Sequence, residues 1–333
     1  MSDFGSVLKR LSAGQTLNEE DAAHAFGEIM AGEISPMRIA AFLMALAVRK
    51  PTVAEITGAA RAMGSAMRKV DAPGAAIDVC GTGGDGHGTL NVSTAVAFVV
   101  AACGVPVAKH GNRNASSRTG AADVLEMLGV PVKLEPDAAA AALRENNFVF
   151  LFAQAYHPAM KHVGPVRAEL GFRTIFNILG PISNPAGVKR QLIGVFSPEW
   201  IEPMAHVLAA LGTEKAIIVH GADGLDEISL SGPTHAAILE RGKITRMEIE
   251  PKDAGLPRAP LSAIKGGDAA ENAAAIRALF DGKKSAFRDI VLLNAAAALM
   301  VADKASELTS GVMLAASAID EGKAKAVLAR AAQ

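Results

Sequence analysis

The stretch IDVCGTGGDGHGTLNVST, residues 77–94, decides which fold the chain can adopt. IDVC is typical of a short strand, five of the eight residues from Gly81 to Gly88 are glycine, and a helix is predicted from about Val92. A strand that runs through glycines into a helix gathers accessible N–H groups and the positive end of a helix, which favours a phosphate. A plain strand-to-helix connection needs only a few residues, so we interpret this loop as an anion-binding site.

Strand-like and helix-like segments alternate after this loop. Further strands are predicted at 105–111, 148–153, 191–197 and 215–221. A hairpin is predicted at 236–250, with its turn at Gly242-Lys243, and the remaining residues form alanine-rich helices, one of them opened by Gly266-Gly267. Such alternation is typical of a mainly parallel sheet flanked by helices.

The N-terminal residues predict helices alone. Asn18, Ser35-Pro36 and Thr52 with Glu55 are helix-start signals. The segment 158–187 interrupts the later alternation and is also helical, so we expect it to return to the N-terminal helices. The predicted fold class is therefore α/β. A small, discontinuous helical domain is expected at 1–72, joined by about 160–186, and a larger α/β domain at 73–159 and 187–333.

Charge and cysteine content narrow the class of protein. The formal net charge is −1 without long runs of either sign, whereas nucleic-acid and membrane-surface proteins are usually strongly basic. Cys80 and Cys103 stand in apolar stretches, which is typical of free thiols in a reducing compartment. The chain has no apolar signal segment, and its longest apolar run, from Ala95 to Ala108, is too short to cross a bilayer. We expect a soluble, cytoplasmic protein that binds neither nucleic acid nor membrane.

Two familiar nucleotide motifs do not fit the glycine loop. Gly81, Gly83 and Gly86 match the dinucleotide pattern G-x-G-x-x-G, which requires an acidic residue about 20 positions later for the ribose. The next strand instead ends in Lys109-His110, which is cationic. The loop also lacks the Gly-Lys-Ser/Thr sequence of a P-loop. A nicotinamide cofactor is therefore disfavoured.

A second polar loop, KHGNRNASSRTG at 109–120, follows the second strand. It combines cationic and imidazole groups with an amide and hydroxyls: Lys109, His110, Asn112, Arg113, Ser116, Ser117 and Arg118. Ligands of open parallel sheets bind at the carboxyl ends of the strands, so both loops are expected on one edge. Together they predict a pocket for a multiply phosphorylated ligand.

DGLDEISL at 223–230 follows another predicted strand. Its adjacent carboxylates, Asp226 and Glu227, suit Mg²⁺, which is commonly shared between carboxylates and substrate phosphates. An acidic surface turn is the alternative, and we prefer the metal because a phosphate pocket is expected on the same edge.

The segment 156–185 carries polar side chains on an apolar helical background. An arginine there can hold the carboxylate of a second substrate with paired hydrogen bonds. A helix cap or an interdomain contact is the alternative, which we favour for Arg173 and leave open for Arg167. The histidines outside these motifs are expected on the surface: His24, His206, His220 and His235.

At GTGGDG, NVST, KHGNR, VRAELGFRTIFNILGP, NPAG and DGLDE the chain resembles the anthranilate phosphoribosyltransferase family. The resemblance covers essentially the whole chain. It implies the phosphorylase-type phosphoribosyltransferase fold and a homodimer associating through the helical domain. It also implies Mg²⁺-dependent transfer of 5-phosphoribose from 5-phosphoribosyl 1-pyrophosphate (PRPP) to the amine of anthranilate. The products are N-(5-phosphoribosyl)anthranilate and pyrophosphate, the second step of tryptophan biosynthesis.

The same resemblance implies roles for individual residues. PRPP would contact Gly81, Gly84, Asp85, Thr89, Asn91, Val92, Ser93, Thr94, Lys109, His110, Gly111, Asn112, Arg113, Asn114, Ala115, Ser116, Ser117 and Ala121. Anthranilate would contact Gly81, Asn112 and Arg167, with His110 and His157 nearby. Mg²⁺ would be bound by Ser93, Asp226 and Glu227. Lys109 and Arg167 are the expected catalytic residues, through positioning and charge stabilisation, and no general base is assigned.

The chain departs from the family pattern at a few positions. Leu90 and Val92 replace Phe and Ile, and Asn114-Ala115 replaces Ala-Val. Ala121 stands where Ser is usual, which puts one hydroxyl contact to the pyrophosphate in doubt.

Two other functions remain as alternatives. A pyrimidine nucleoside phosphorylase shares the architecture, but KHGNR and DGLDE fit a pyrophosphate donor better. A nucleic-acid-binding paralogue of the same fold would need many more cations.

Overall fold

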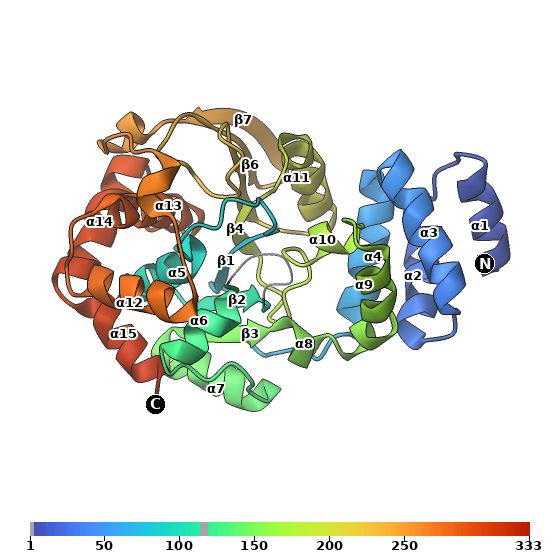
Figure 1. Ribbon diagram of the computed structural model, residues 1–333, viewed down its shortest axis with the longest axis horizontal. Coiled ribbons are helices and arrows are strands. Elements are labelled where there is room, and N and C mark those ends of the chain that lie inside the picture. The colour runs from blue at the N-terminus through green and yellow to red at the C-terminus, as the bar shows by residue number, and fades with distance from the viewer. Residues whose placement is uncertain (1–2, 114–118) are drawn as a thin grey trace.

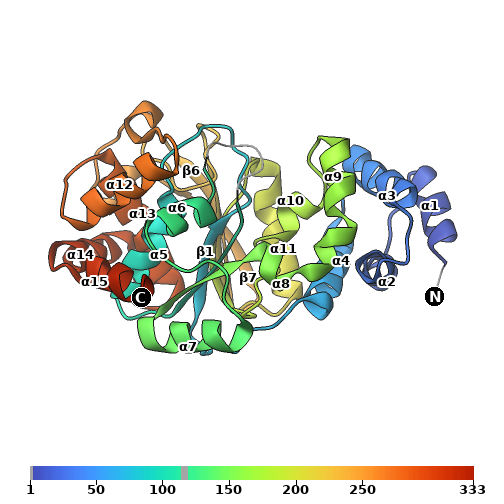
Figure 2. The ribbon, with the colours of Figure 1, turned by 60° about the horizontal axis from the view of Figure 1, so that its bottom comes forward.

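The computed structural model describes residues 3–113 and 119–333. Four helices open the chain and gather at one end of the molecule, opposite the C-terminal helices (Figures 1 and 2). They are α1 (Phe4–Ser12), α2 (Glu19–Ala31), α3 (Pro36–Arg49) and α4 (Val53–Ala66). Asn18 caps α2 through its side chain, and Pro36 occupies the first turn of α3. The predicted helical N-terminal part is confirmed.

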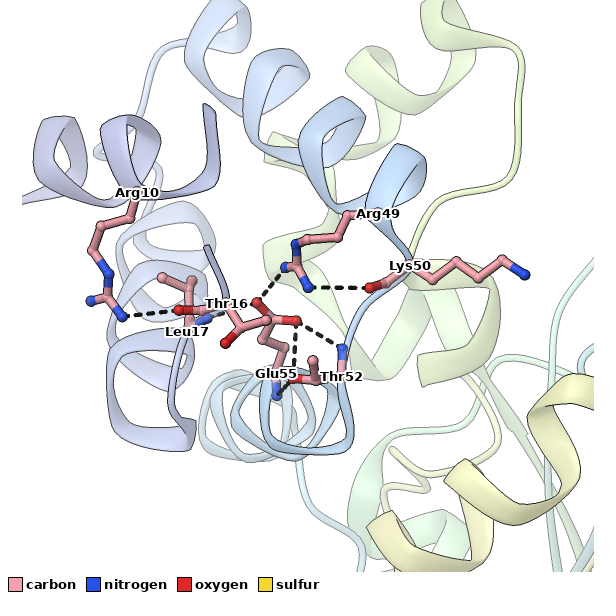
Figure 3. A network of polar contacts seen from close by, with 7 residues as sticks. All are labelled: Arg10, Thr16, Leu17, Arg49, Lys50, Thr52 and Glu55. Carbon is pink, nitrogen blue, oxygen red and sulfur yellow. Dashed lines mark hydrogen bonds and ion pairs between the residues drawn. The ribbon is translucent and has the colours of Figure 1, made fainter. Parts of the chain in front are cut away.

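The start of α4 is organised by one buried carboxylate (Figure 3). Glu55 and Thr52 form the predicted capping box. Glu55 also accepts hydrogen bonds from Arg49 Nη2 at 2.5 Å and from Leu17 N at 2.9 Å. Its carboxylate is fully buried with donors on both oxygens, which is what makes a buried charge tolerable. The loop before α2, the end of α3 and the start of α4 are thereby joined.

In the described residues, seven strands form one sheet in the order β3-β2-β1-β4-β5-β6-β7. The parallel strands are β1 (Ile77–Gly81), β2 (Val107–Gly111), β3 (Phe148–Phe152), β4 (Arg190–Gly194) and β5 (Lys215–Gly221). The antiparallel hairpin is β6 (Thr234–Glu240) and β7 (Lys243–Ile249). The mainly parallel sheet and the hairpin agree with the prediction.

The hairpin turn lies one residue earlier than predicted. It is formed by Arg241 and Gly242, whose φ angles are 50° and 78°, and Lys243 already belongs to β7. Two-residue hairpin loops favour positive φ at both central positions, because that backbone twist matches the twist of the strands. The glycine is therefore the second turn residue and not the first.

Helices cover both faces of the sheet (Figures 1 and 2). One face packs Val79, Leu192 and Ile217 against α5 (Val92–Ala102) and α13 (Ala286–Val301). The other face packs Ile193 and Ile218 against α11 (Ile201–Ala210). Neighbouring residues of one strand thus face opposite layers, as the pleat requires. The remaining α-helices are α6 (Ala121–Met127), α7 (Pro136–Asn146), α8 (Ala153–Tyr156), α9 (Gly164–Leu170), α10 (Phe176–Leu179), α12 (Ala269–Phe280), α14 (Leu308–Asp320) and α15 (Lys323–Ala331).

The segment that interrupts the alternation lies beside the N-terminal helices in both ribbon views. Val163 and Val166 share an apolar cluster with residues of α2 and α3, and the ring of Phe176 lies edge-on to Phe26 at 5.8 Å. The same cluster continues into α11 and one face of the sheet. Because one apolar cluster joins these parts, the predicted domain boundaries stay a prediction.

Candidate active site

The carboxyl ends of the parallel strands bring three predicted motifs together. Gly81 at the end of β1 is paired with Gly194 at the end of β4. The loop after β5 reaches across both, because Asp226 Oδ2 accepts a hydrogen bond from Gly83 N at 2.8 Å. A Cβ at Gly194 would overlap the backbone of Asp226, so only glycine permits this approach. The glycine loop and the acidic motif, 143 residues apart, are therefore in contact.

The second half of the glycine loop is held by residues 264–266, at the point where the sequence predicted the start of a helix. Leu90 N donates to Ile264 O at 2.9 Å, and Gly266 N donates to Gly88 O at 2.9 Å. A Cβ on Gly266 would stand 2.6 Å from the carbonyl oxygen of Thr89. Gly266-Gly267 was predicted to open a helix, but α12 begins at Ala269. The first of these glycines instead allows two backbone segments to pack closely.

Lys109 lies beneath the start of α5. Its side chain is only 2% exposed, and Nζ donates to Val79 O at 2.6 Å and to Ser93 Oγ at 3.1 Å. Thr94, the next residue of α5, is fully buried, and its hydroxyl has no hydrogen-bond partner among the described residues. A buried cation and an unpaired hydroxyl thus stand at a helix N-terminus, where an anion is favoured.

Asp78 supports the strand that carries Lys109. This fully buried carboxylate accepts hydrogen bonds from His110 N at 3.1 Å and from Asn184 Nδ2 at 2.8 Å. Burial raises the pKa of Asp78 to about 6, although Lys109 and these hydrogen bonds act in the opposite direction. Sequence reasoning missed this role for Asp78 and Asn184. The available signals were a charge inside a strand and the asparagine of NPAG.

Asp226 and Glu227 form a poorly compensated acidic pair. Burial raises both carboxyl pKa values, Asp85 raises that of Asp226 further, and Asp226 raises that of Glu227 further. Glu227 Oε1 also accepts a hydrogen bond from Ser93 N at 3.1 Å. Adjacent carboxylates that repel one another gain stability from a cation placed between them. The chemistry of these donors therefore fits a divalent metal ion.

The number of protein ligands limits how such a metal ion would be held. The described residues contain no group of three or more His, Cys, Asp and Glu side chains arranged around a metal position. Mg²⁺ commonly uses one or two carboxylates and completes its coordination with substrate phosphates and water. Asp226 and Glu227 fit this arrangement, with the hydroxyl of Ser93 adjacent to it.

The acidic loop is fixed from below by Asn294, which sequence reasoning also missed. This fully buried residue of α13 accepts a hydrogen bond from Ile228 N and donates one to Ile228 O, both at 2.9 Å. Ile228 directly follows Glu227. A side-chain amide that binds both polar groups of one residue acts like a neighbouring strand and sets the position of the loop.

A second group of residues lies on the side of the helical segment. The rings of His110 and His157 are 5.2 Å apart, and the Nε2 atoms of both are buried without a partner among the described residues. Burial lowers the pKa of His110 to about 3 and that of His157 to about 4, so both rings are neutral near pH 7. His110 Nδ1 lies 3.0 Å from Gly180 O. Since a carbonyl only accepts, Nδ1 carries the proton and Nε2 presents its lone pair.

Arg167 is half-buried on α9 with its guanidinium 5.6 Å from the Phe176 ring centre. Burial lowers its pKa, and among the described residues it has no ion pair. Arg173 instead donates to Gly84 O and stacks on Phe196 at 4.2 Å. Arg173 thus contacts the glycine loop from the helical segment, and a structural contact stays the favoured interpretation for it.

Several predicted contact residues are paired or buried within the chain, or lie outside its described part. Arg113 is paired with Asp123 at 2.7 Å and with Glu126, so its guanidinium is directed to α6. Val92 is buried in the core, which leaves only its backbone for a ligand. Asn112 is exposed, and its Oδ1 accepts a hydrogen bond from Arg113 N at 2.8 Å. Asn114, Ala115, Ser116 and Ser117 lie outside the described residues.

Other predicted residues lie where the loops meet. Ala121 is the first residue of α6 and lies close to Gly111, the last residue of β2. Thr89 bridges to Lys265 in the loop that covers the glycines. The loss of a hydroxyl at Ala121, where the family usually has Ser, therefore falls at the edge of the second polar loop.

One surface prediction was wrong. His220 is buried, and its Nδ1 lies 2.7 Å from Val195 O. It lies on the same face of β5 as Ile218, because side chains of a strand alternate between the two faces, and α11 covers that face.

Comparison with known proteins shows the family to which the chain belongs. Residues 6–67 match a family model for the glycosyl transferase helical bundle domain, and residues 73–325 match one for the glycosyl transferase a/b domain. An anthranilate phosphoribosyltransferase of Rhodopseudomonas palustris (strain BisB18) is 56% identical over 328 residues, covering 98% of this chain and 97% of the relative. This chain belongs to the anthranilate phosphoribosyltransferase family. The predicted resemblance and fold class are confirmed.

Solved structures of family members agree along the whole chain. The enzyme of Thermus thermophilus is 46% identical, with a TM-score of 0.93 and 98% coverage of both chains. The Saccharomyces cerevisiae enzyme, in complex with PRPP and Mg, is 29% identical, with a TM-score of 0.91 and coverage of 99% of this chain and 97% of that one. The yeast enzyme has also been solved in complex with 4-fluoroanthranilate, at 28% identity, a TM-score of 0.89 and coverage of 98% and 96%.

Proposed function

We propose that this chain transfers 5-phosphoribose from PRPP to the amine of anthranilate, the second step of tryptophan biosynthesis. The observation that carries the proposal is the meeting of a buried lysine, a helix N-terminus and an acidic pair at one glycine loop. Lys109 contacts Ser93, and Glu227 accepts from the same residue of α5. Family membership favours this reaction over nucleoside phosphorolysis and over nucleic-acid binding.

The donor half of the site would bind PRPP. The glycine-loop amides, the start of α5 and Lys109 offer hydrogen bonds and positive charge to the phosphates. Asp226 and Glu227 would hold Mg²⁺, with Ser93 alongside, and the bound ion would offset the negative charge of the pyrophosphate. The yeast relative in complex with PRPP and Mg supports this assignment.

The acceptor half would bind anthranilate beside Gly81 and Asn112. Arg167 is a half-buried cation without an acidic partner among the described residues, which suits the carboxylate of the substrate. His110 and His157 present neutral, unpaired ring nitrogens, which suit a neutral aromatic amine. The complex of the yeast relative with 4-fluoroanthranilate supports an aromatic acid as the second substrate.

The reaction breaks the C1–O bond of PRPP and forms a C1–N bond, and the amine loses one proton. Negative charge grows on the departing pyrophosphate, so donors that are already in place lower the barrier without rearrangement. Lys109 is such a donor, since two hydrogen bonds hold its ammonium group. Arg167 would orient the amine toward C1, which replaces a chance encounter with a fixed geometry. No general base is assigned.

The predicted homodimer also belongs to this proposal. Met37, Met44 and Val48 are 83%, 44% and 79% exposed, and their spacing places them on one side of α3. A second copy of the chain would cover this apolar stripe. A Met37→Glu, Val48→Glu variant should sediment as a monomer where the wild type sediments as a dimer. A monomeric wild type would contradict the proposal.

The described residues include no helix that is long and apolar enough to cross a membrane. We propose that the enzyme acts in the cytoplasm, which agrees with the free thiols of Cys80 and Cys103.

The direct test follows the fluorescence of anthranilate. Purified protein is mixed with Mg²⁺, PRPP and micromolar anthranilate, and each component is omitted in turn. Loss of anthranilate emission that needs all the components supports the proposal. Phosphorolysis of thymidine or uridine by a protein that leaves anthranilate intact would replace it with the nucleoside phosphorylase alternative.

A further inference from the structure

Asn91 stands at the start of α5 but does not cap this helix. An asparagine at this position normally accepts a hydrogen bond from an N–H group of the first helical turn. Asn91 makes no such bond. Its Oδ1 instead accepts a hydrogen bond from Asn272 Nδ2 at 2.8 Å. Val92 N and Ser93 N already have other acceptors, so the N–H group of Thr94 is the one in the first turn of α5 without a hydrogen bond among the described residues.

The orientation of both amides follows from one backbone group. Gly267 N donates to Asn272 Oδ1 at 2.9 Å, and an N–H can only donate, so this atom of Asn272 is its oxygen. The other end of the Asn272 amide is then NH₂, which requires an acceptor. Asn91 must therefore turn its oxygen toward Asn272. Its Nδ2 is left without a partner among the described residues.

Asn272 is well placed to impose this orientation. It is 1% exposed and belongs to α12, whose start is fixed by a capping box between Asp268 and Glu271. The segment before α12 is bonded to the glycine loop through Ile264 O and Gly266 N. A buried amide held on both sides has little freedom to turn, whereas Asn91 is only half-buried.

We propose that Asn272 is a positioning residue, which keeps the NH₂ group of Asn91 available to a phosphate of PRPP and the start of α5 open to the same anion. The inference rests on the proposed function, in which Asn91 contacts PRPP. An NH₂ group donates a charge-assisted hydrogen bond to a phosphate oxygen, whereas a carbonyl oxygen in the same place repels it. Asn272 therefore decides whether Asn91 attracts or repels the substrate.

The test is a double-mutant cycle on the intact enzyme, read as the dissociation constant of PRPP in the presence of Mg²⁺ by calorimetry. Asn272→Asp keeps the acceptor for Gly267 N but replaces the NH₂ group with an acceptor, so Asn91 must reverse. We expect PRPP binding to weaken by about tenfold or more, the effect of one hydrogen bond to a charged group. Asn272→Ala leaves Asn91 free to turn either way, so we expect a smaller weakening, of about two- to fivefold.

The Asn91→Ala background shows whether Asn272 acts through Asn91. There, both Asn272 variants should change PRPP binding by less than about twofold, because coupled residues lose their separate effects in such a cycle. An unchanged effect of Asn272→Asp in that background would overturn the proposal, since added charge or structural damage would then explain it. The KM of anthranilate should stay within about twofold throughout. If Asn272→Asp does not fold, the cycle with Asn272→Ala decides alone.

The wild-type measurement separates this inference from the function on which it rests. A wild type that does not bind PRPP with Mg²⁺ would overturn the proposed function and this inference with it. A wild type that binds PRPP, together with Asn272 variants that bind it equally well, would overturn this inference alone.

Discussion

The two halves of the candidate site differ in how their polar groups are satisfied. In the donor half, Lys109 is already bonded to Val79 O and Ser93 Oγ. In the acceptor half, the Nε2 atoms of His110 and His157 and the guanidinium of Arg167 have no such partners among the described residues. The ammonium group of Lys109 is thus held in place before a ligand arrives, as charge stabilisation requires. The acceptor half leaves buried polar groups unpaired, which favours a ligand that can pair with them.

Of the substitutions in the donor half, removal of the Lys109 side chain should lower activity the most. We expect Lys109→Ala to lower kcat/KM by a factor that corresponds to about 2–4 kcal/mol of lost transition-state stabilisation, the contribution of one preorganised charged contact. Steady-state rates with each substrate varied, at saturating levels of the other, measure the loss. Circular dichroism is the control, because Lys109 also offsets the buried Asp78. A loss of less than tenfold in a folded variant would place Lys109 outside the catalytic machinery.

The acidic pair tests whether the donor half needs a metal ion. Asp226→Asn combined with Glu227→Gln removes both carboxylates without changing side-chain shape. We expect the Mg²⁺ concentration for half-maximal activity to rise by about 100-fold, since even partners of metal ligands commonly contribute 10- to 100-fold. A magnesium titration at fixed PRPP provides the measurement. An unchanged titration would refute the metal site. Asp253→Asn is the control, because it changes an exposed carboxylate that accepts a hydrogen bond from Glu250 N.

Replacing Arg167 should change the KM of anthranilate much more than the KM of PRPP. Arg167→Ala is expected to raise the KM of anthranilate about 10- to 100-fold, which corresponds to one hydrogen-bonded charge pair. The KM of PRPP should change by less than about threefold, because Arg167 lies on the acceptor side. Arg38→Ala is a suitable control, since this arginine of the same helical part stacks on Phe4 at 5.5 Å. Equal increases in both KM values would contradict the division into halves.

The acceptor histidine His157 should be visible in stability and not in catalysis, as a dependence of unfolding on pH. The pKa of His157 is about 4 in the folded protein, below its ordinary value of 6.5, so the unfolded chain binds the extra proton between these values. Folding stability therefore falls as the pH drops from about 6.5 to 4, by at most about 1.4 kcal/mol per pH unit for one group. Asp78 acts with the opposite sign, because its pKa is raised to about 6.

Comparison of variants separates the contribution of His157 to the pH dependence of stability from that of Asp78. Urea unfolding of wild type and His157→Gln between pH 4 and 7 should show the wild type losing stability more steeply as the pH falls. The contribution of Asp78 is common to both and cancels in the difference. His206→Gln, at an exposed helix position, should follow the wild type. Parallel curves for wild type and His157→Gln would show that the His157 ring is not held neutral.

Local signals in the sequence predicted much of the molecule. Glycines before a helix, the capping box of Thr52 and Glu55, and polar loops after short strands each depend on residues a few positions apart. The wrong predictions for His220 and Gly266 have a common cause, because both depend on segments that are distant in the sequence. The buried position of His220 depends on α11 packing on that face of the sheet, and the role of Gly266 depends on the backbone of Thr89.

The sequence by itself determined the helical N-terminal part and the mainly parallel sheet, and it singled out the motifs for which phosphate, metal and carboxylate chemistry is proposed. It did so because strand and helix periodicity, turn residues and charge placement act over short stretches of chain. Only the tertiary structure decided which amides hold those motifs in place. Asn272 reaches Asn91 across 181 positions and Asn294 reaches Ile228 across 66. A buried amide must find its partners wherever the fold brings them, and no pattern of neighbouring residues records that distance.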